Sequence, residues 1–210
     1  MRSRHSTLVL LSTALICGAL VGCQSSSHEV RYEVSVSEAV VEGNAPETGP
    51  GTQEIALRVE WSATSAGLSA HFTNPADTTA AILWEEATFS YGSEEPEPLI
   101  STAPHADSEL PQPPTLIPGF GVVIIGMLPR SHAEWEWFPS RAMGGSWSAS
   151  SGLFGVTLTS EQSDSERQSL AATVIGKKAM IEIPVRTGSR VLTHIYDVRV
   201  TRAEVYASYH

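Results

Sequence analysis

The sequence predicts an all-β protein: an antiparallel, Ig-like β-sandwich of about eight or nine strands, with one short helix, preceded by a cleaved signal peptide. Three observations predict this class. Apolar and polar residues alternate with a period of two in several segments, turn-forming residues separate these segments, and a single segment has helical features. A barrel is the main alternative. No internal repeat of roughly 20–50 residues is visible, which argues against a propeller or a solenoid.

The first half of the predicted domain consists of strands joined by turns. Strict alternation predicts strands over residues 30–41, 54–61 and 67–74. The last of these runs into a turn at residues 74–77, where proline occupies the second position. Residues 80–91 are predicted to form one longer strand.

The middle of the chain is rich in proline and glycine. Within residues 94–118, only Leu99–Ile100 resembles a strand, because proline denies the backbone its ladder donors. Residues 121–128 form a continuous apolar run, which predicts a strand covered on both faces. Residues 134–138 alternate again and predict a strand, whereas residues 141–152 are rich in glycine and serine and predict a loose loop.

The last part of the chain predicts the helix and two closing strands. Residues 160–172 suit a short helix capped by Ser160 or Ser163, and Glu166 follows Ser163 at capping-box spacing. Two strands follow within residues 178–205, around a Thr-Gly-Ser turn. Their predicted inward positions are Ala179, Ile181, Ile183, Val185, Leu192, His194, Tyr196, Val198 and Val200.

Composition restricts the function. The formal net charge is −10, which argues against binding to nucleic acid, because that requires lysine and arginine to neutralise phosphates. A hydrophobic content of 41% is that of a folded domain rather than a disordered stalk. The two cysteines are Cys17, within an apolar N-terminal segment, and Cys23, so no disulfide is expected in the folded domain.

The N-terminus has the features of a secretory signal. Arg2 and Arg4 precede a largely apolar segment, residues 7–20, which is shorter than the roughly twenty residues of a spanning helix. The run Leu-Val-Gly22-Cys23 then resembles the lipobox of bacterial lipoproteins. This resemblance implies cleavage between Gly22 and Cys23, a diacylglyceryl group on the Cys23 thiol and acylation of the new amine.

The resemblance also implies an organisation and a location. Residues 1–22 would be the lipoprotein signal peptide, residues 23–28 the lipidated cysteine with a short tether, and residues 29–210 a single domain. Each buried methylene contributes about 0.8 kcal/mol, so several acyl chains suffice as a membrane anchor. The residue after Cys23 is glutamine rather than aspartate, which in this family implies the outer membrane, with the domain in the periplasm.

A second resemblance concerns the domain itself. An F-x-N turn and a tryptophan-containing strand are followed by a P-x-x-I-P-G stretch before an apolar strand. This order is similar to that of uncharacterised bacterial lipoproteins with an Ig-like domain, and it implies a fold and a location but no reaction. The matching residues are Phe72, Asn74, Asp77, Trp84, Pro114, Ile117, Pro118 and Gly119.

No motif for catalysis, for a metal or for a cofactor is found. Six of the seven histidines follow Cys23, and none has a partner at HxH or HExxH spacing. The serines at 146, 148, 150 and 151 lack a G-x-S-x-G elbow, and Glu134 with Glu136 is interpreted as a solvated acidic face. We therefore expect no catalytic residue, no metal site, no cofactor and no enzymatic activity.

The remaining candidates are aromatic residues in predicted loops, where sandwich scaffolds commonly bind partners. These are Tyr91, Phe120, Phe138 and Trp147. The expected function is an interaction or structural module of the cell envelope, with an envelope protein as partner. Two alternatives stay open: an envelope hydrolase acting on glycan or ester substrates, and a module that binds a small ligand or acts as an inhibitor.

Substitution of Cys23 by alanine tests the anchor. We expect Cys23→Ala to lose both palmitate incorporation and signal removal, because the thiol is the acceptor of the lipid. Metabolic labelling and mass spectrometry of the N-terminus measure the two effects, with Ser25→Ala as the control. A Cys23→Ala chain that is cleaved normally and still bound to membranes would contradict the assignment.

Overall fold

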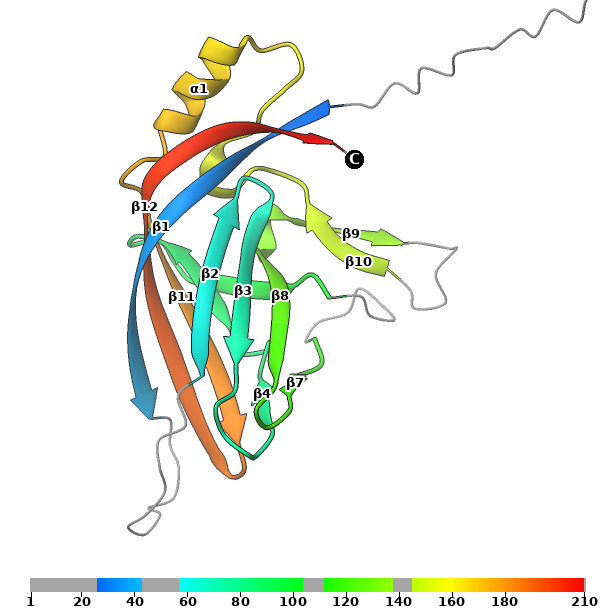
Figure 1. The fold of residues 1–210 in the computed structure, drawn as a ribbon, viewed down its shortest axis with the longest axis vertical. Helices are drawn as coiled ribbons and strands as arrows, with labels where there is room; N and C mark the ends of the chain where they lie inside the picture. Colours follow the sequence, from blue (N-terminus) through cyan, green and yellow to red (C-terminus); the bar gives the residue numbers. More distant parts are fainter. Residues whose placement is uncertain (1–25, 43–56, 104–111, 138–144, 210) are drawn as a thin grey trace, which may run out of the picture.

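The computed structural model describes residues 26–42, 57–103, 112–137 and 145–209, and the protein is all-β with antiparallel pairing throughout (Figure 1). The strands are β1 (Ser26–Glu42), β2 (Arg58–Thr64), β3 (Gly67–Thr73), β4 (Ala80–Ile82), β5 (Thr88–Tyr91), β6 (Glu97–Ser101), β7 (Thr115–Ile117), β8 (Val122–Pro129), β9 (Ala133–Trp137), β10 (Gly145–Ala149), β11 (Lys178–Thr187) and β12 (Arg190–Tyr209).

Most strands belong to one sheet that closes on itself. The order β12-β1-β2-β3-β8-β6-β5-β11 returns to its start, because β11 also pairs with β12. Strands β4 and β7 extend the sheet from β11, and β9 pairs with β10 in a separate hairpin. The predicted all-β class is confirmed, but the described strands form a closed barrel rather than the two facing sheets of an Ig-like sandwich. Inward and outward side chains alternate along the strands of a sandwich and of a barrel alike, so only the pairing of strands distinguishes the two architectures.

The barrel interior is filled by the inward residues of the alternating strands. Every inward position predicted for β11 and β12 is buried. Phe72 of β3 and Phe89 of β5 are fully buried beside them, and Trp61 of β2 packs edge-to-face against Tyr196 with ring centroids 5.0 Å apart. The prediction of these strands and of their inward faces is therefore confirmed.

The long strand predicted over residues 80–91 is wrong, because two strands with a turn between them occupy this segment. Ile82 of β4 pairs with Val185 of β11, and Thr88 of β5 pairs with Glu182 of the same strand. Between these pairs β11 contains Pro184, which has no N–H to donate to a ladder. Its carbonyl accepts from the N–H of Leu83 at 2.9 Å, after which the chain turns away and rejoins β11 at Thr88.

Two strands lie where the sequence predicted irregular chain. Strand β7 lies in the proline-rich segment and pairs with β4. Strand β10 lies in the segment rich in glycine and serine, where Trp147 pairs with Trp135 of β9. A Cβ at Gly145 would come within 2.2 Å of the Glu136 carbonyl oxygen, so glycine here permits close approach of the hairpin strands rather than a loose loop.

The predicted helix is confirmed as α1 (Asp164–Ala172), and the capping residue is Ser163 rather than Ser160. The Ser163 hydroxyl accepts from the Glu166 N–H, and the Glu166 carboxylate accepts from the Ser163 N–H at 2.7 Å. The helix lies over β12 at one end of the barrel and buries Ala171 there (Figure 1). No helix among the described residues is long and apolar enough to cross a membrane.

Substitution of Ser163 tests the contribution of this cap. Ser163→Ala removes a hydrogen bond that satisfies an unpaired helix N–H, and should lower the free energy of unfolding by about 1 kcal/mol. Ser169→Ala, on the exposed surface of the same helix, is the control and should be neutral or slightly stabilising. Urea denaturation followed by circular dichroism measures both, and equal effects would contradict the assigned cap.

Candidate functional site

The candidate site begins with a fully buried polar residue, Asn74, which follows strand β3. Its side-chain amide donates to the carbonyl oxygens of Thr78 at 2.8 Å, Ile117 at 3.2 Å and Pro118 at 3.2 Å. Its side-chain oxygen accepts from the N–H of Ala76 at 3.1 Å. Asn74 therefore fastens the segment after β7 to the turn after β3, two segments far apart in sequence.

Other residues of the second resemblance lie around the same point. The indole N–H of Trp84 donates to the Thr115 hydroxyl at 2.9 Å, which holds the start of β7. A Cβ at Gly119 would lie 2.2 Å from the Asp77 carbonyl oxygen, so only glycine permits the two turns to touch. The motif residues thus form one structural unit rather than a set of reacting groups.

This unit holds Phe120 on the surface in a strained conformation. The Gly121 N–H donates to the Pro118 carbonyl at 2.9 Å, which places Phe120 at the third position of a four-residue turn. Its φ of 56° is the left-handed value that glycine or asparagine normally supplies there, at a cost of roughly 1–2 kcal/mol for other residues. The ring is 74% exposed, so its own burial does not offset this cost.

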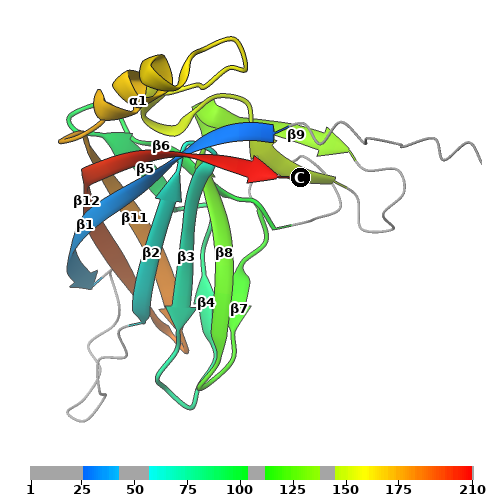
Figure 2. The same ribbon diagram turned by 45° about the horizontal axis from the view of Figure 1, so that its top comes forward.

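Three more apolar residues are exposed in the two strands that flank the turn of Phe120. Leu116 on β7 is 62% exposed, and Val122 and Ile124 on β8 are 58% and 65% exposed. The turn of Phe120 joins β7 to β8, and both ribbon views show the two strands side by side (Figures 1 and 2). We call these four residues the Phe120 patch. The prediction that β8 is covered on both faces is wrong, because nothing described covers Val122 and Ile124.

The Phe120 patch lies at the end of the barrel away from the start of β1. Strand β8 pairs with β3 so that Val122 lies opposite Thr73, whereas the other end of the β2–β3 hairpin, at Thr64, pairs with Arg31 of β1. Figure 2 shows the start of β1 and the turn between β7 and β8 at opposite ends. A patch on rigid strands at a barrel end is a suitable surface for a partner.

Tyr91, the second candidate aromatic residue, is half-buried at the other end of the barrel. Its hydroxyl accepts from the Phe154 N–H at 3.1 Å and lies 3.0 Å from Nε2 of His132, whose Nδ1 lies 2.7 Å from the Ser151 hydroxyl. Burial raises the pKa of Tyr91 to about 12, so the phenol keeps its proton near neutral pH.

The contacts between Tyr91, His132 and Ser151 bear on the hydrolase alternative, because a histidine beside a serine could activate it. The donor and acceptor roles in both His132 contacts depend on the tautomer of the imidazole. In a catalytic triad, the ring nitrogen away from the serine bonds to a carboxylate, which stabilises the imidazolium. Here that nitrogen faces the Tyr91 phenol, which is neutral near pH 7, so the arrangement lacks the third group of a triad.

The other candidates are located as follows. Trp147 is only 5% exposed, packs on Trp135 with ring centroids 5.5 Å apart and lies under the Arg130 guanidinium, so its predicted surface role is wrong. Its place in β10 turns it toward the barrel wall, which the glycine-rich sequence around it concealed. Phe138, Gly22 and Cys23 lie outside the described residues.

The titratable residues of the described segments form no metal site of three or more ligands. His71 is exposed, and Glu134 and Glu136 are exposed on β9 as predicted. His194 is buried in the barrel, where Nδ1 bonds to the Glu38 carboxylate at 2.7 Å. His194 therefore occupies the inward position that the alternation predicts, as a hydrogen-bonded core residue.

No protein-family model matches the chain, and no curated protein or solved structure shows significant similarity to it. The site therefore rests on geometry alone. Sequence reasoning identified Phe120 but missed Leu116, Val122 and Ile124, because a continuous apolar run is typical of a doubly covered strand. The Gly-Phe-Gly turn was the signal available: a bulky residue between two glycines directly before that run.

Substitution of Asn74 by aspartate tests how the patch is held. Asn74→Asp keeps the shape but replaces an amide that donates to three carbonyls with a buried carboxylate, which should cost about 3–5 kcal/mol. Asn74→Ala, which brings no charge, should cost less, about 1–3 kcal/mol. Denaturant unfolding measures both; the aspartate variant should regain stability as the pH falls, because protonation removes its charge. Equal stability of the two variants at neutral pH would contradict this account.

Proposed function

We propose that this protein is a membrane-anchored envelope lipoprotein that works as an interaction module, and that the Phe120 patch binds an envelope partner protein. The exposed patch is the observation that carries the proposal. Monomeric proteins rarely expose several large apolar side chains together without a partner for them. The strained turn adds support, because backbone strain is usually retained where an exposed group has a use.

The proposed anchor favours a protein over a lipid surface as the occupant of the patch. Cys23 precedes Ser26, the first residue of β1, by three positions. A lipid on Cys23 would keep the β1 end of the barrel close to the bilayer, with the Phe120 patch at the far end (Figure 2). The patch would then face away from that membrane, toward other envelope proteins.

The charge of the chain favours a different protein over a second copy. The formal net charge of −10 makes two copies repel each other, whereas the four patch residues carry no charge. The partner surface is therefore expected to be apolar at its centre and neutral or basic around it. Asn74, Ile117 and Pro118, which belong to the second resemblance, are hydrogen-bonded to one another beneath the patch.

Of the two alternatives, the hydrolase has the weaker support in the geometry, because the histidine that contacts Ser151 is backed by the Tyr91 phenol and not by a carboxylate. The small-ligand alternative needs a concave site with converging polar groups. Such a cavity lies at the other end of the barrel, and it is independent of the patch.

A substitution that suits the strained turn tests the patch without disturbing the fold. Phe120→Asn removes the ring but supplies a residue that tolerates the left-handed conformation, so stability should stay the same or rise slightly. Crosslinking in intact cells followed by mass spectrometry should show at least a tenfold loss of the partner adduct.

The matched control is Ile175→Asn, which removes an exposed apolar side chain in the α1–β11 connection at the other end of the barrel. This variant should keep the adduct. Equal crosslinking by wild type and Phe120→Asn, with both chains folded, would overturn the patch as the binding surface. Adducts composed of two copies of the chain would overturn the choice of partner.

A further inference from the structure

The chain has only two lysines, Lys177 and Lys178, and both line the same cavity. This cavity has a volume of about 600 Å³ and lies at the end of the barrel opposite the Phe120 patch. Tyr91 and Phe154 supply aromatic surface, His132 and Ser93 supply polar groups, and Glu94 is the single carboxylate. The two lysines are neighbours in the sequence, so one short segment brings both ammonium groups of an acidic chain to this cavity.

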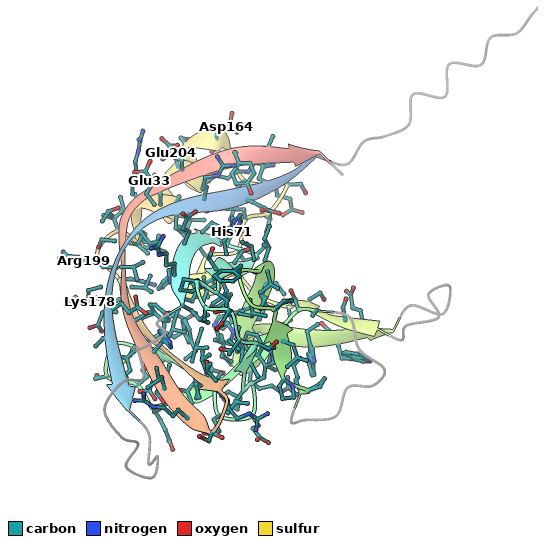
Figure 3. All side chains as sticks on the ribbon, turned by 60° about the horizontal axis from the view of Figure 1, so that its bottom comes forward. Glu33, His71, Asp164, Lys178, Arg199 and Glu204 are labelled. Atoms are coloured by element: carbon teal, nitrogen blue, oxygen red, sulfur yellow. The ribbon has the colours of Figure 1, made fainter. Side chains whose placement is uncertain are left out.

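Lys178 also faces a second cation on the neighbouring strand. It lies directly opposite Arg199 of β12, and Figure 3 shows both side chains at the same side of the barrel. Like charges directly opposite each other destabilise a sheet. Neither side chain forms an ion pair with any residue of the described segments, although the chain contains 23 acidic residues. Both side chains are exposed to solvent, and Asp197 lies on the same face of β12, two positions before Arg199.

Both cations line a second, smaller cavity of about 370 Å³ together with Ser35, Ser37 and Asp197. Lys178 belongs to both cavities, so it stands between them. A negative ligand group beside Lys178 would be attracted by Lys177, Lys178 and Arg199 and repelled by Asp197. Two serine hydroxyls on the smaller cavity add donors suited to anionic oxygens.

The rim of the larger cavity is built from unusual backbone. Gly92, Gly155 and the non-glycine residue Phe154 line it with positive φ, and they come from two different loops. The Lys177 ammonium group donates to the Phe154 carbonyl at 2.7 Å, which links the segment before β11 to one of these loops. Glycine adopts positive φ without strain, so Phe154, with a φ of 60°, is the one strained residue of the three. Backbone strain of this kind is often retained at binding sites.

We propose that the Lys177–Lys178 cavity binds a phosphate group of a small ligand. Lysine is a common phosphate ligand, because its ammonium group is a point charge with three donors for the phosphate oxygens. The volume exceeds what a bare phosphate fills and is in the usual range for small-molecule sites. The rest of the ligand lies against Tyr91 and Phe154. This site is separate from the Phe120 patch and does not depend on it.

The same phosphate chemistry occurs in soluble sugar phosphates and in lipid headgroups. The negative charge of the whole chain argues against a long polyanion, because only a local group of cations faces the cavity. One phosphate on a compact ligand pairs with the two lysines of the larger cavity without bringing further negative charge toward Glu94. The experiment must therefore separate a phosphate monoester from a headgroup diester.

Isothermal titration calorimetry of the full chain provides the test. The probes are inorganic phosphate, glucose 6-phosphate and a short-chain, water-soluble phosphatidylglycerol, with glucose and acetate as controls. Lys178→Gln should weaken binding of the phosphate probes about tenfold, since it removes a charged hydrogen bond. Arg186→Gln removes one exposed positive charge from the far end of the same strand, and should leave binding unchanged.

Each outcome decides the proposal. Binding of glucose 6-phosphate that depends on Lys178 supports a soluble ligand, and binding confined to phosphatidylglycerol supports a headgroup. Acetate binding as strong as that of phosphate overturns the phosphate preference. Absence of binding by all phosphate probes, or equal weakening by Lys178→Gln and Arg186→Gln, overturns the site. Circular dichroism shows that the variants are folded, so a loss of binding reports on the cavity.

Discussion

Strand β12 is hydrogen-bonded along both edges, to β1 on one side and to β11 on the other, and this double pairing closes the sheet. Both cysteines of the chain precede Ser26, so no disulfide links the described strands and closure depends on backbone pairing and core packing. A closed sheet leaves few unpaired edges, which limits pairing with other chains. The two candidate surfaces lie at opposite ends of this barrel, where strands give way to turns.

Local sequence patterns predicted the individual strands and the helix better than they predicted which strands pair with each other. The inward residues of β11 and β12 and the Ser163 cap follow from alternation and spacing within one segment, and all are found as expected. Closure into a barrel depends on which strands meet, which alternation does not encode. The break between β4 and β5 depends on Pro184, about a hundred residues further along the chain, so no local signal at the break announces it.

The candidate surfaces show the same limit. Phe120 was predictable because an aromatic residue between two glycines suits a turn, whereas Val122 and Ile124 were expected inside, since their run of apolar residues is also typical of a buried strand. The error for Trp147 was the opposite one: it was predicted to lie in a loop, and it is buried in a strand. The two lysines belong to no recognisable motif in the sequence. The loops around Tyr91 and Phe154 form a cavity beside them, and those loops are distant from the lysines in sequence.

The pairing of Ser26 with Tyr209 places the first and last described strand residues next to each other. A reporter fused after Tyr209 would therefore emerge beside the start of β1, in the crowded zone near any lipid on Cys23. The Thr187–Arg190 hairpin turn lies at the other end of these strands, where a short inserted epitope would stay within reach of an antibody. The choice between the two insertion points decides whether a label reports on the anchored side of the domain or on its free end.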